Sequence, residues 1–255
     1  MNSSHVSRRT VLARTAVITG AAIAAGLPAS RFLSPAAYAA GKDPIPPAVK
    51  EAVRQAQERQ RRVLTGKPSH NGWEMERVAD GGGSIFTRPV PGTPLAGIAV
   101  RMGDVEAVLV HLVRRFHYGI DELRKGDVVG WHSPSAVRHE LPESNLASGT
   151  AVRIRPGHFP VGNHGGFFPL QLMAIRDILA ELDGAVRWGG DDRKVDEALF
   201  YVDVKPGDVR LREVANKIRG WQEMAGQGAG APVDLAAPAR RNAAKALERR
   251  QKSAA

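Results

Sequence analysis

The chain has 255 residues, of which 43% are hydrophobic, and it carries 36 basic against 26 acidic side chains. This composition is sufficient for one domain with a hydrophobic core and short extensions. The sequence has no cysteine, which excludes disulfides, thiolate metal sites and cysteine nucleophiles.

The first 39 residues have the pattern of an export signal. Arg8 and Arg9 are adjacent, an apolar run follows at residues 15–28, and residues 37–39 (AYA) have the small side chains of a cleavage site. The paired arginines resemble a twin-arginine (Tat) signal, so we expect a protein exported to the periplasm, the cell wall or the exterior. A membrane anchor is the alternative, but the apolar run is shorter than the about 20 residues that a span needs.

The positive charge lies mainly at the two ends of the chain. Residues 1–39 hold four arginines and no acid, so their removal lowers the net charge from +10 to +6. Residues 40–70 and 225–255 each carry +4, whereas residues 71–224 carry −2. Basic ends on a near-neutral middle do not predict a nucleic-acid partner. The ends either contact anionic lipids or wall polymers, or they are solvated helix faces without a partner.

Both basic ends contain helical patterns. Residues 46–64 begin with proline and place small apolar side chains at helical spacing among charges, which predicts an amphipathic helix that Gly66-Lys67-Pro68 ends. Residues 224–241 are rich in Gly, Ala and Pro and predict a linker. Residues 240–255 form either a short helix or a disordered tail.

The middle of the chain predicts an α+β fold. Strand patterns occur at residues 97–102, 149–155, 185–188 and 197–204, and a turn with a short strand at residues 80–92. Helix patterns occur at residues 105–123, 168–182 and 207–221, the first with Asp104 and the last with Asp208 as N-cap. The connections are long and lack a βαβ period. We therefore expect a small antiparallel sheet with helices packed around it.

Five segments resemble those of a known family. They are SNLASGTAVRI (144–154), PGHFPVG (156–162), AIRDIL (174–179), VRWGGD (186–191) and DEALFYV (196–202). Their order and spacing resemble the D-alanyl-D-alanine carboxypeptidase-like zinc peptidases of bacterial cell walls, whose segments read S-N-H-A-S-G-T-A-x-D, x-R-W-G-G-D and D-E-M-H-F-E. The resemblance runs from about residue 71 to residue 221. It implies a carboxypeptidase-like core at 71–224, after a signal peptide (1–39) and a helical arm (40–70), and before a linker and basic tail (225–255).

The resemblance also implies a chemistry that this chain lacks the ligands to perform. In the family, two histidines and one aspartate hold a zinc ion that activates water and polarises the peptide bond. The matching positions here are Leu146, Arg153 and Leu199. Leucine has no lone pair to donate, and arginine stays protonated and repels a dication. We therefore expect no zinc and a catalytically inactive protein that binds a peptidoglycan peptide or an envelope protein.

Other positions of the family pattern are retained. Asp196 stands three residues before the lost second histidine, where a general base is expected, whereas Tyr201 replaces the closing glutamate. By the resemblance, the candidate substrate-binding residues are Arg138, Ser144, Asn145, Arg153, Trp188 and Asp191.

Four alternatives remain open. The first is that the protein is still a wall peptidase, with a displaced metal or altered ligands. The second is a relocated metal site at His158 and His164, which share one loop. The third is a serine-hydrolase site of His132, Ser133 and His139, for which the G-x-S-x-G motif is missing. Finally, Trp131 and Trp188 either belong to the core or stack on a ligand.

Arg153 leads to a specific structural prediction. A buried arginine without a partner is strongly disfavoured. We expect its guanidinium within about 4 Å of Asp196, or of Asp191 as second choice. Leu146 and Leu199 should lie buried side by side. The alternative is that Arg153 turns into solvent and the leucines join the core.

Overall fold

The computed structural model describes residues 46–253. The chain divides into two compact units after Val53, within helix α2 (Pro47–Val63). Of the first unit, only residues 46–53 are described, and all of them except residue 46 belong to the start of this helix. The predicted export signal lies outside the described residues. The fold and the site below belong to the second unit.

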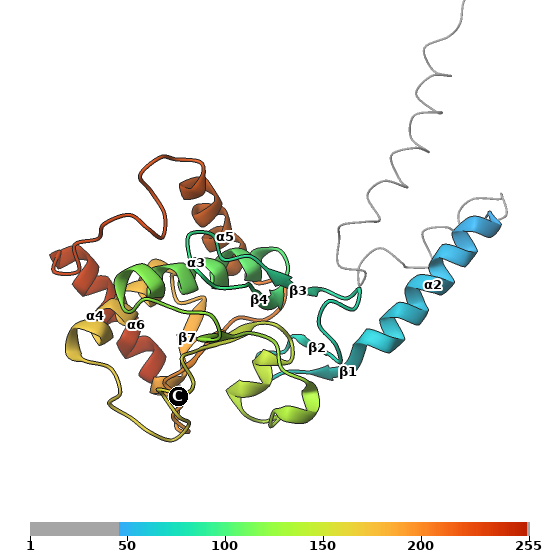
Figure 1. The fold of residues 1–255 in the computed structure, drawn as a ribbon, viewed down its shortest axis with the longest axis horizontal. Coiled ribbons are helices and arrows are strands. Elements are labelled where there is room, and N and C mark those ends of the chain that lie inside the picture. The colour runs from blue at the N-terminus through green and yellow to red at the C-terminus, as the bar shows by residue number, and fades with distance from the viewer. Residues whose placement is uncertain (1–45, 254–255) are drawn as a thin grey trace, which may run out of the picture. The chain divides into compact units, whose positions relative to one another are not determined.

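The main sheet has four antiparallel strands in the order β5-β6-β8-β7, of which β7 is labelled in Figure 1. These are β5 (Val128–Val129), β6 (Ala151–Ile154), β8 (Leu199–Val202) and β7 (Val186–Trp188). Two smaller antiparallel pairs join β1 (Leu64–Pro68) to β2 (Glu74–Glu76) and β3 (Ile85–Arg88) to β4 (Ile98–Arg101). The expected α+β class with small antiparallel sheets is confirmed.

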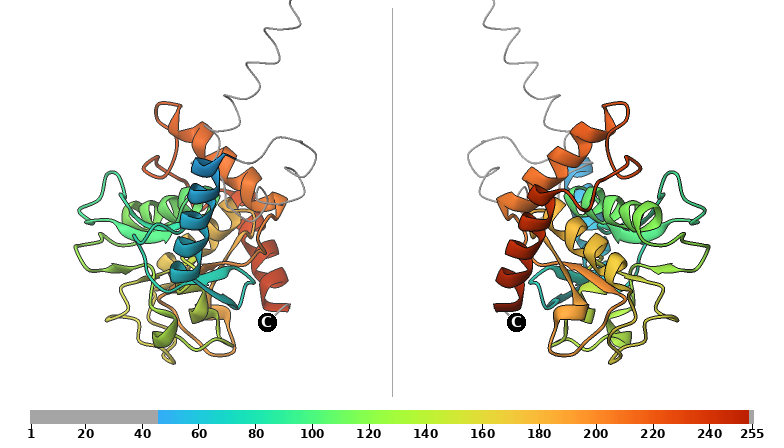
Figure 2. Two further views of the ribbon diagram at one scale, coloured as in Figure 1. Left: turned by 90° about the vertical axis from the view of Figure 1, so that its right-hand side faces the viewer. Right: turned by 90° about the vertical axis from the view of Figure 1, so that its left-hand side faces the viewer.

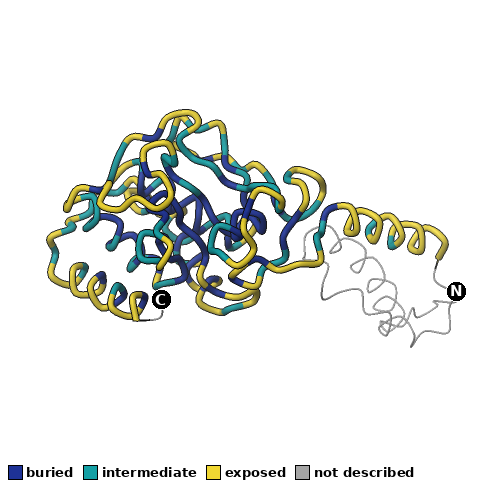
Figure 3. Tube along the Cα trace, turned by 90° about the horizontal axis from the view of Figure 1, so that it is seen from below, coloured by how far each residue is buried: buried dark blue, intermediate teal, exposed yellow. Residues whose placement is uncertain are grey.

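Helices α3 (Asp104–Gly119), α4 (Pro169–Glu181) and α5 (Val209–Gln222) bury their apolar stripes in the main core with the sheet. Short 3-10 turns η3 (Pro134–Ala136), η4 (Pro142–Leu146) and η5 (Gly189–Asp191) connect the strands. Figure 3 shows the buried residues gathered in the interior of the compact unit, whereas α2 is exposed along most of its length. Among the described residues, no helix is both long and apolar enough to cross a membrane.

Most helix boundaries lie within two residues of the sequence patterns, but α3 ends at Gly119 rather than at residue 123, and α6 (Pro238–Ser253) begins inside the predicted linker. The N-cap of α3 and the end of α2 also differ. Asp208 caps α5 as expected, its carboxylate accepting from the Arg210 N–H. Asp104, in contrast, is the first residue of α3, and Gly103 with a φ of 93° is the N-cap, a left-handed conformation that glycine adopts without strain. Helix α2 ends at Val63 rather than at Gly66-Lys67-Pro68, because the next five residues pair as strand β1.

The C-terminal segment forms helix α6 (Pro238–Ser253), which packs against α4 (Figure 2). Ala244, Leu247 and Gln251 are buried. Arg240 donates to both carboxylate oxygens of Asp177 at 2.7 and 2.6 Å. The final basic segment is therefore a docked helix of the compact unit and not a separate tail.

Candidate functional site

The side chains of β6 and β8 alternate between the two faces of the sheet. One set points into the main core with the helices: Val152, Ile154, Phe200 and Val202. The other set belongs to a smaller buried cluster, which comprises Met75, Val137, Leu146, Ala147, Ala151, Leu199 and Tyr201. Arg153 lies two residues after Ala151 and therefore emerges on the side of this small cluster.

Arg153 is held by two carboxylates. Its Nε and Nη2 donate to Asp196 Oδ2 at 2.9 and 2.7 Å, and Nη2 also donates to Glu143 Oε2 at 3.1 Å. The Arg153 side chain is only 16% exposed. The predicted ion pair with Asp196 is confirmed, and the alternative that Arg153 turns into solvent is wrong.

Glu143 extends this pair into a chain of four charges. Arg138 donates to Glu143 Oε1 through Nε at 2.6 Å and to Oε2 through Nη2 at 3.0 Å. Hydrogen bonds from Arg138, with a further one from Arg153, lower the pKa of Glu143 to about 2. Glu143 therefore stays ionised at neutral pH and links the half-exposed Arg138 to the more buried pair of Arg153 and Asp196. We call these four residues the charge chain.

The two leucines are buried as expected. Leu146 is 0% and Leu199 2% exposed, and both belong to the small cluster. Leu199 is also the Cα partner of Arg153 in the pairing of β6 with β8. The three positions that the resemblance assigns to zinc ligands therefore gather in one place.

The residues at these positions do not fit a zinc ion. Two hydrocarbon side chains and one guanidinium supply no lone pair. Elsewhere among residues 46–253, no three His, Asp or Glu side chains are placed to hold a metal ion. His158 and His164 are both exposed in their loop.

Ser144 and Asn145 are fully buried and hold a neighbouring loop. Ser144 Oγ accepts from the His70 N–H at 2.9 Å, and Asn145 Oδ1 accepts from the Asn71 N–H at 3.0 Å. Their polar groups thus anchor residues 69–73 to η4. Ser144 follows Glu143 directly, but neither the Ser144 nor the Asn145 side chain forms a hydrogen bond with a residue of the charge chain.

Trp188 and Asp191 likewise lie apart from the charge chain. Trp188 is buried in the main core and donates from Nε1 to the Glu197 carbonyl at 2.8 Å. Asp191 pairs with Arg176, whose guanidinium also lies 5.0 Å from the Trp188 ring centroid. Asp191 is therefore not the partner of Arg153. A stacking role for Trp188 would require it to leave the core.

Asp192 is a nearby acid that the sequence patterns did not single out. It accepts from the Tyr201 hydroxyl at 3.0 Å and from Arg187 Nε at 3.0 Å. Burial raises the pKa of Asp192 and also that of Tyr201. Tyr201, at the position that the resemblance assigns to a closing glutamate, is thus a buried hydroxyl donor rather than a second carboxylate.

A small pocket opens beside the charge chain. Its charged lining residues are Arg138, Glu143, Asp192, Lys194 and Asp196, and its apolar ones are Leu141, Pro142, Val161 and Leu199. Its volume of about 20 Å³ has room for one or two water molecules. We call it the Asp196 pocket.

The serine-hydrolase pattern is not assembled. Ser133 Oγ lies 2.8 Å from Ser135 Oγ, and no hydrogen bond joins it to His132 or His139 among the described residues. Burial, with the positive charge of Arg153, lowers the pKa of His132. This histidine is therefore a neutral neighbour of the charge chain at pH 7.

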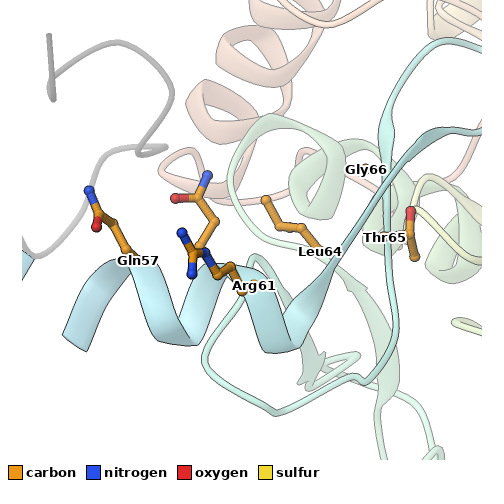
Figure 4. A pocket seen from close by; sticks show the side chains of 6 residues that line it. Gln57, Arg61, Leu64, Thr65 and Gly66 are labelled. Atoms are coloured by element: carbon orange, nitrogen blue, oxygen red, sulfur yellow. The ribbon is translucent and has the colours of Figure 1, made fainter. Parts of the chain in front are cut away.

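A second hollow lies where α2 runs into β1 (Figure 4). It is lined by Gln57, Gln60, Arg61, Leu64, Thr65 and Gly66. Among the described residues that line it, Arg61 is the one charged side chain, and none has a carboxylate, imidazole or thiol. These residues offer no group for acid–base or nucleophilic chemistry, so the Asp196 pocket is the better candidate site.

Comparison with protein-family models, with curated proteins and with solved structures finds no match to this chain. The resemblance to the zinc peptidases therefore rests on the five sequence segments.

Proposed function

We propose that this chain is an exported cell-envelope protein that binds a peptidoglycan peptide or an envelope protein without cleaving it. Its core would be a D-alanyl-D-alanine carboxypeptidase-like domain that has lost its zinc site. One observation carries the proposal. The positions that resemble zinc ligands lie together, and they are filled by two buried leucines and an arginine paired with Asp196.

Hydrolysis of a peptide bond by this family's route needs a Lewis acid. A metal ion lowers the pKa of a bound water and polarises the substrate carbonyl. Arg153 can donate hydrogen bonds at this place, but it has no empty orbital with which to bind a water oxygen. The guanidinium supplies fixed positive charge there, which suits binding better than hydrolysis.

Export and the wall ligand rest on the sequence. The paired arginines, the apolar run and the AYA site of residues 1–39 support export. The family resemblance supports a wall peptide as ligand class. The alternative, an active peptidase with altered metal ligands, gains no support from the described residues.

Residues 40–255, purified without added metal, test the proposal. We expect no stoichiometric zinc by elemental analysis, no release of D-alanine from a wall pentapeptide, and cosedimentation with purified peptidoglycan. One equivalent of zinc together with chelator-sensitive release of D-alanine would establish the active-peptidase alternative instead. Absence of binding to peptidoglycan would refute the wall ligand and leave an envelope protein as partner.

A further inference from the structure

Helix α6, the red helix at the surface in Figure 2, carries a row of cations on its outer side. Arg241, Lys245 and Arg249 are exposed, and no described residue forms an ion pair or a side-chain hydrogen bond with them. Residues four positions apart lie on the same side of a helix. With a rise of about 1.5 Å per residue, the three side chains form a row about 12 Å long. We call this row the α6 ridge.

The ridge has no counterion within its own helix. Glu248 is the one acid of α6, and it pairs with Lys252 at 2.7 Å and with Arg176 of α4 at 3.4 Å. Arg240, the other cation of α6 with an acidic partner, donates to Asp177 at 2.6 Å. The acids near α6 are thus taken by Arg176, Arg240 and Lys252, and the ridge keeps its full charge.

The docking of α6 does not explain the ridge. The helix is held by Arg240 and by the buried residues Ala244, Leu247 and Gln251. Arg241 is the fourth residue of α6, where the helix dipole disfavours a cation, and the first turn holds no acid. Neither packing nor the dipole therefore favours a cation at this position, which points to a partner outside the chain.

The surface beside the ridge restricts the chemistry of this partner. The exposed uncharged residues of α6 are one proline, three alanines, one asparagine and one serine. None of them is an aromatic ring on which a nucleic-acid base can stack, and none is a large apolar side chain that enters a bilayer. The ridge offers charge alone, and it offers it along a line. A linear polyanion complements this arrangement better than a stacked base or an inserted lipid contact does.

We propose that the α6 ridge binds a linear polyanion that carries a phosphate group in each repeat. The guanidinium groups of Arg241 and Arg249 each donate to phosphate oxygens in pairs, and Lys245 adds a point charge between them. A polymer that follows the row brings successive phosphates to the three side chains. That a polymer of the cell wall supplies these phosphates rests on the proposed function, whereas the binding chemistry does not.

Inorganic polyphosphate is the probe, titrated into residues 40–255 and followed by calorimetry at several salt concentrations. The ridge variant carries Arg241→Gln, Lys245→Gln and Arg249→Gln, which remove the charges and keep good helix formers. It should bind polyphosphate about tenfold more weakly than the native chain. Each phosphate contact adds about 0.7 to the slope of log K against log salt, so this slope should also fall by about two.

A control variant separates the ridge from net charge. Lys125→Gln, Lys205→Gln and Arg212→Gln remove the same charge from exposed positions on two loops and on α5. The control should bind polyphosphate as the native chain does. Equal weakening in the ridge variant and the control would mean that overall charge attracts the polymer, and it would overturn the proposal. Absence of binding by the native chain would overturn it as well.

Two further binding partners distinguish the outcomes. Tighter binding to vesicles of anionic phospholipid than to polyphosphate, at equal phosphate concentration, would assign the ridge to a lipid surface and overturn the proposal. Peptidoglycan freed of phosphate polymers tests the proposed function instead, and the ridge variant should cosediment with it as the native chain does. A native chain that binds polyphosphate but not this peptidoglycan would support the present inference and refute only the wall peptide as ligand.

Discussion

Removal of the Arg153 guanidinium should destabilise the fold strongly. In Arg153→Leu, Asp196 loses both donors to Oδ2 while its Oδ1 already has none among the described residues. Removing one partner of a buried ion pair costs about 3–5 kcal/mol. Glu143 keeps Arg138, and Arg153 is not fully buried. We therefore expect the lower end, about 3 kcal/mol.

The double variant separates pairing from packing. Asp196→Leu alone should cost less than Arg153→Leu, because Arg153 keeps its hydrogen bond to Glu143. In Arg153→Leu with Asp196→Leu, no unpaired charge of this pair remains, and replacing a buried ion pair by apolar residues is often close to neutral. The double variant should therefore be more stable than Arg153→Leu.

Urea unfolding of residues 40–255 at pH 7 measures these free energies. Arg210→Leu is the control, because Arg210 pairs with Asp208 at the surface and its loss should cost less than about 1 kcal/mol. If Arg153→Leu costs no more than Arg210→Leu, the charge chain does not support the fold. The interpretation that Arg153 and its carboxylate partners replace a zinc site as part of the folded core would then fail.

Two further predictions concern pH and the last helix. The pKa of Glu143 is lowered to about 2 from 4.5, so its ion pairs contribute stability that is present above pH 4.5 and lost as the pH falls through about 2. The unfolding free energy of Glu143→Gln should therefore fall less steeply over this range than that of the native chain. Equal slopes would contradict the assignment. Arg240→Ala removes the hydrogen bonds of α6 to Asp177 and should lower the free energy of unfolding in urea by about 2 kcal/mol. Arg241 is exposed, so the control Arg241→Ala should lower it little. Equal losses would mean that Arg240 does not hold α6.

Much of the fold was predictable because its signals are local. The apolar stripe of α3 and the alternation in β6 appear in the sequence at their structural spacing, and both are buried as their patterns indicate. Helix α6 gave a weak signal, since Ala244 and Leu247 are its main apolar contacts. Its docking depends on Arg240 meeting acids of α4, a contact between residues about sixty positions apart that no local pattern encodes.

The contacts of the candidate site could be predicted only for residues whose place in the fold a sequence motif specifies. The pairing of Arg153 with Asp196 followed from the resemblance and from the need of a buried charge for a partner. Glu143 was missed as a partner, because its contact depends on how the chain turns into η4 beside Arg138. The Asp192 contact with Tyr201 depends on how β7 leads into η5 beside β8, which sequence spacing does not specify.

The central claim is that Leu146, Arg153 and Leu199 occupy a lost metal site. It is tested most directly by the zinc content of a variant with Leu146→His, Arg153→Asp and Leu199→His, compared with the native chain. The control carries the first two changes and Leu172→His on α4 instead. We predict one equivalent of zinc in the restored variant and none in the native chain or the control. A folded restored variant that binds no more zinc than the control, or a native chain with one equivalent, would contradict the account.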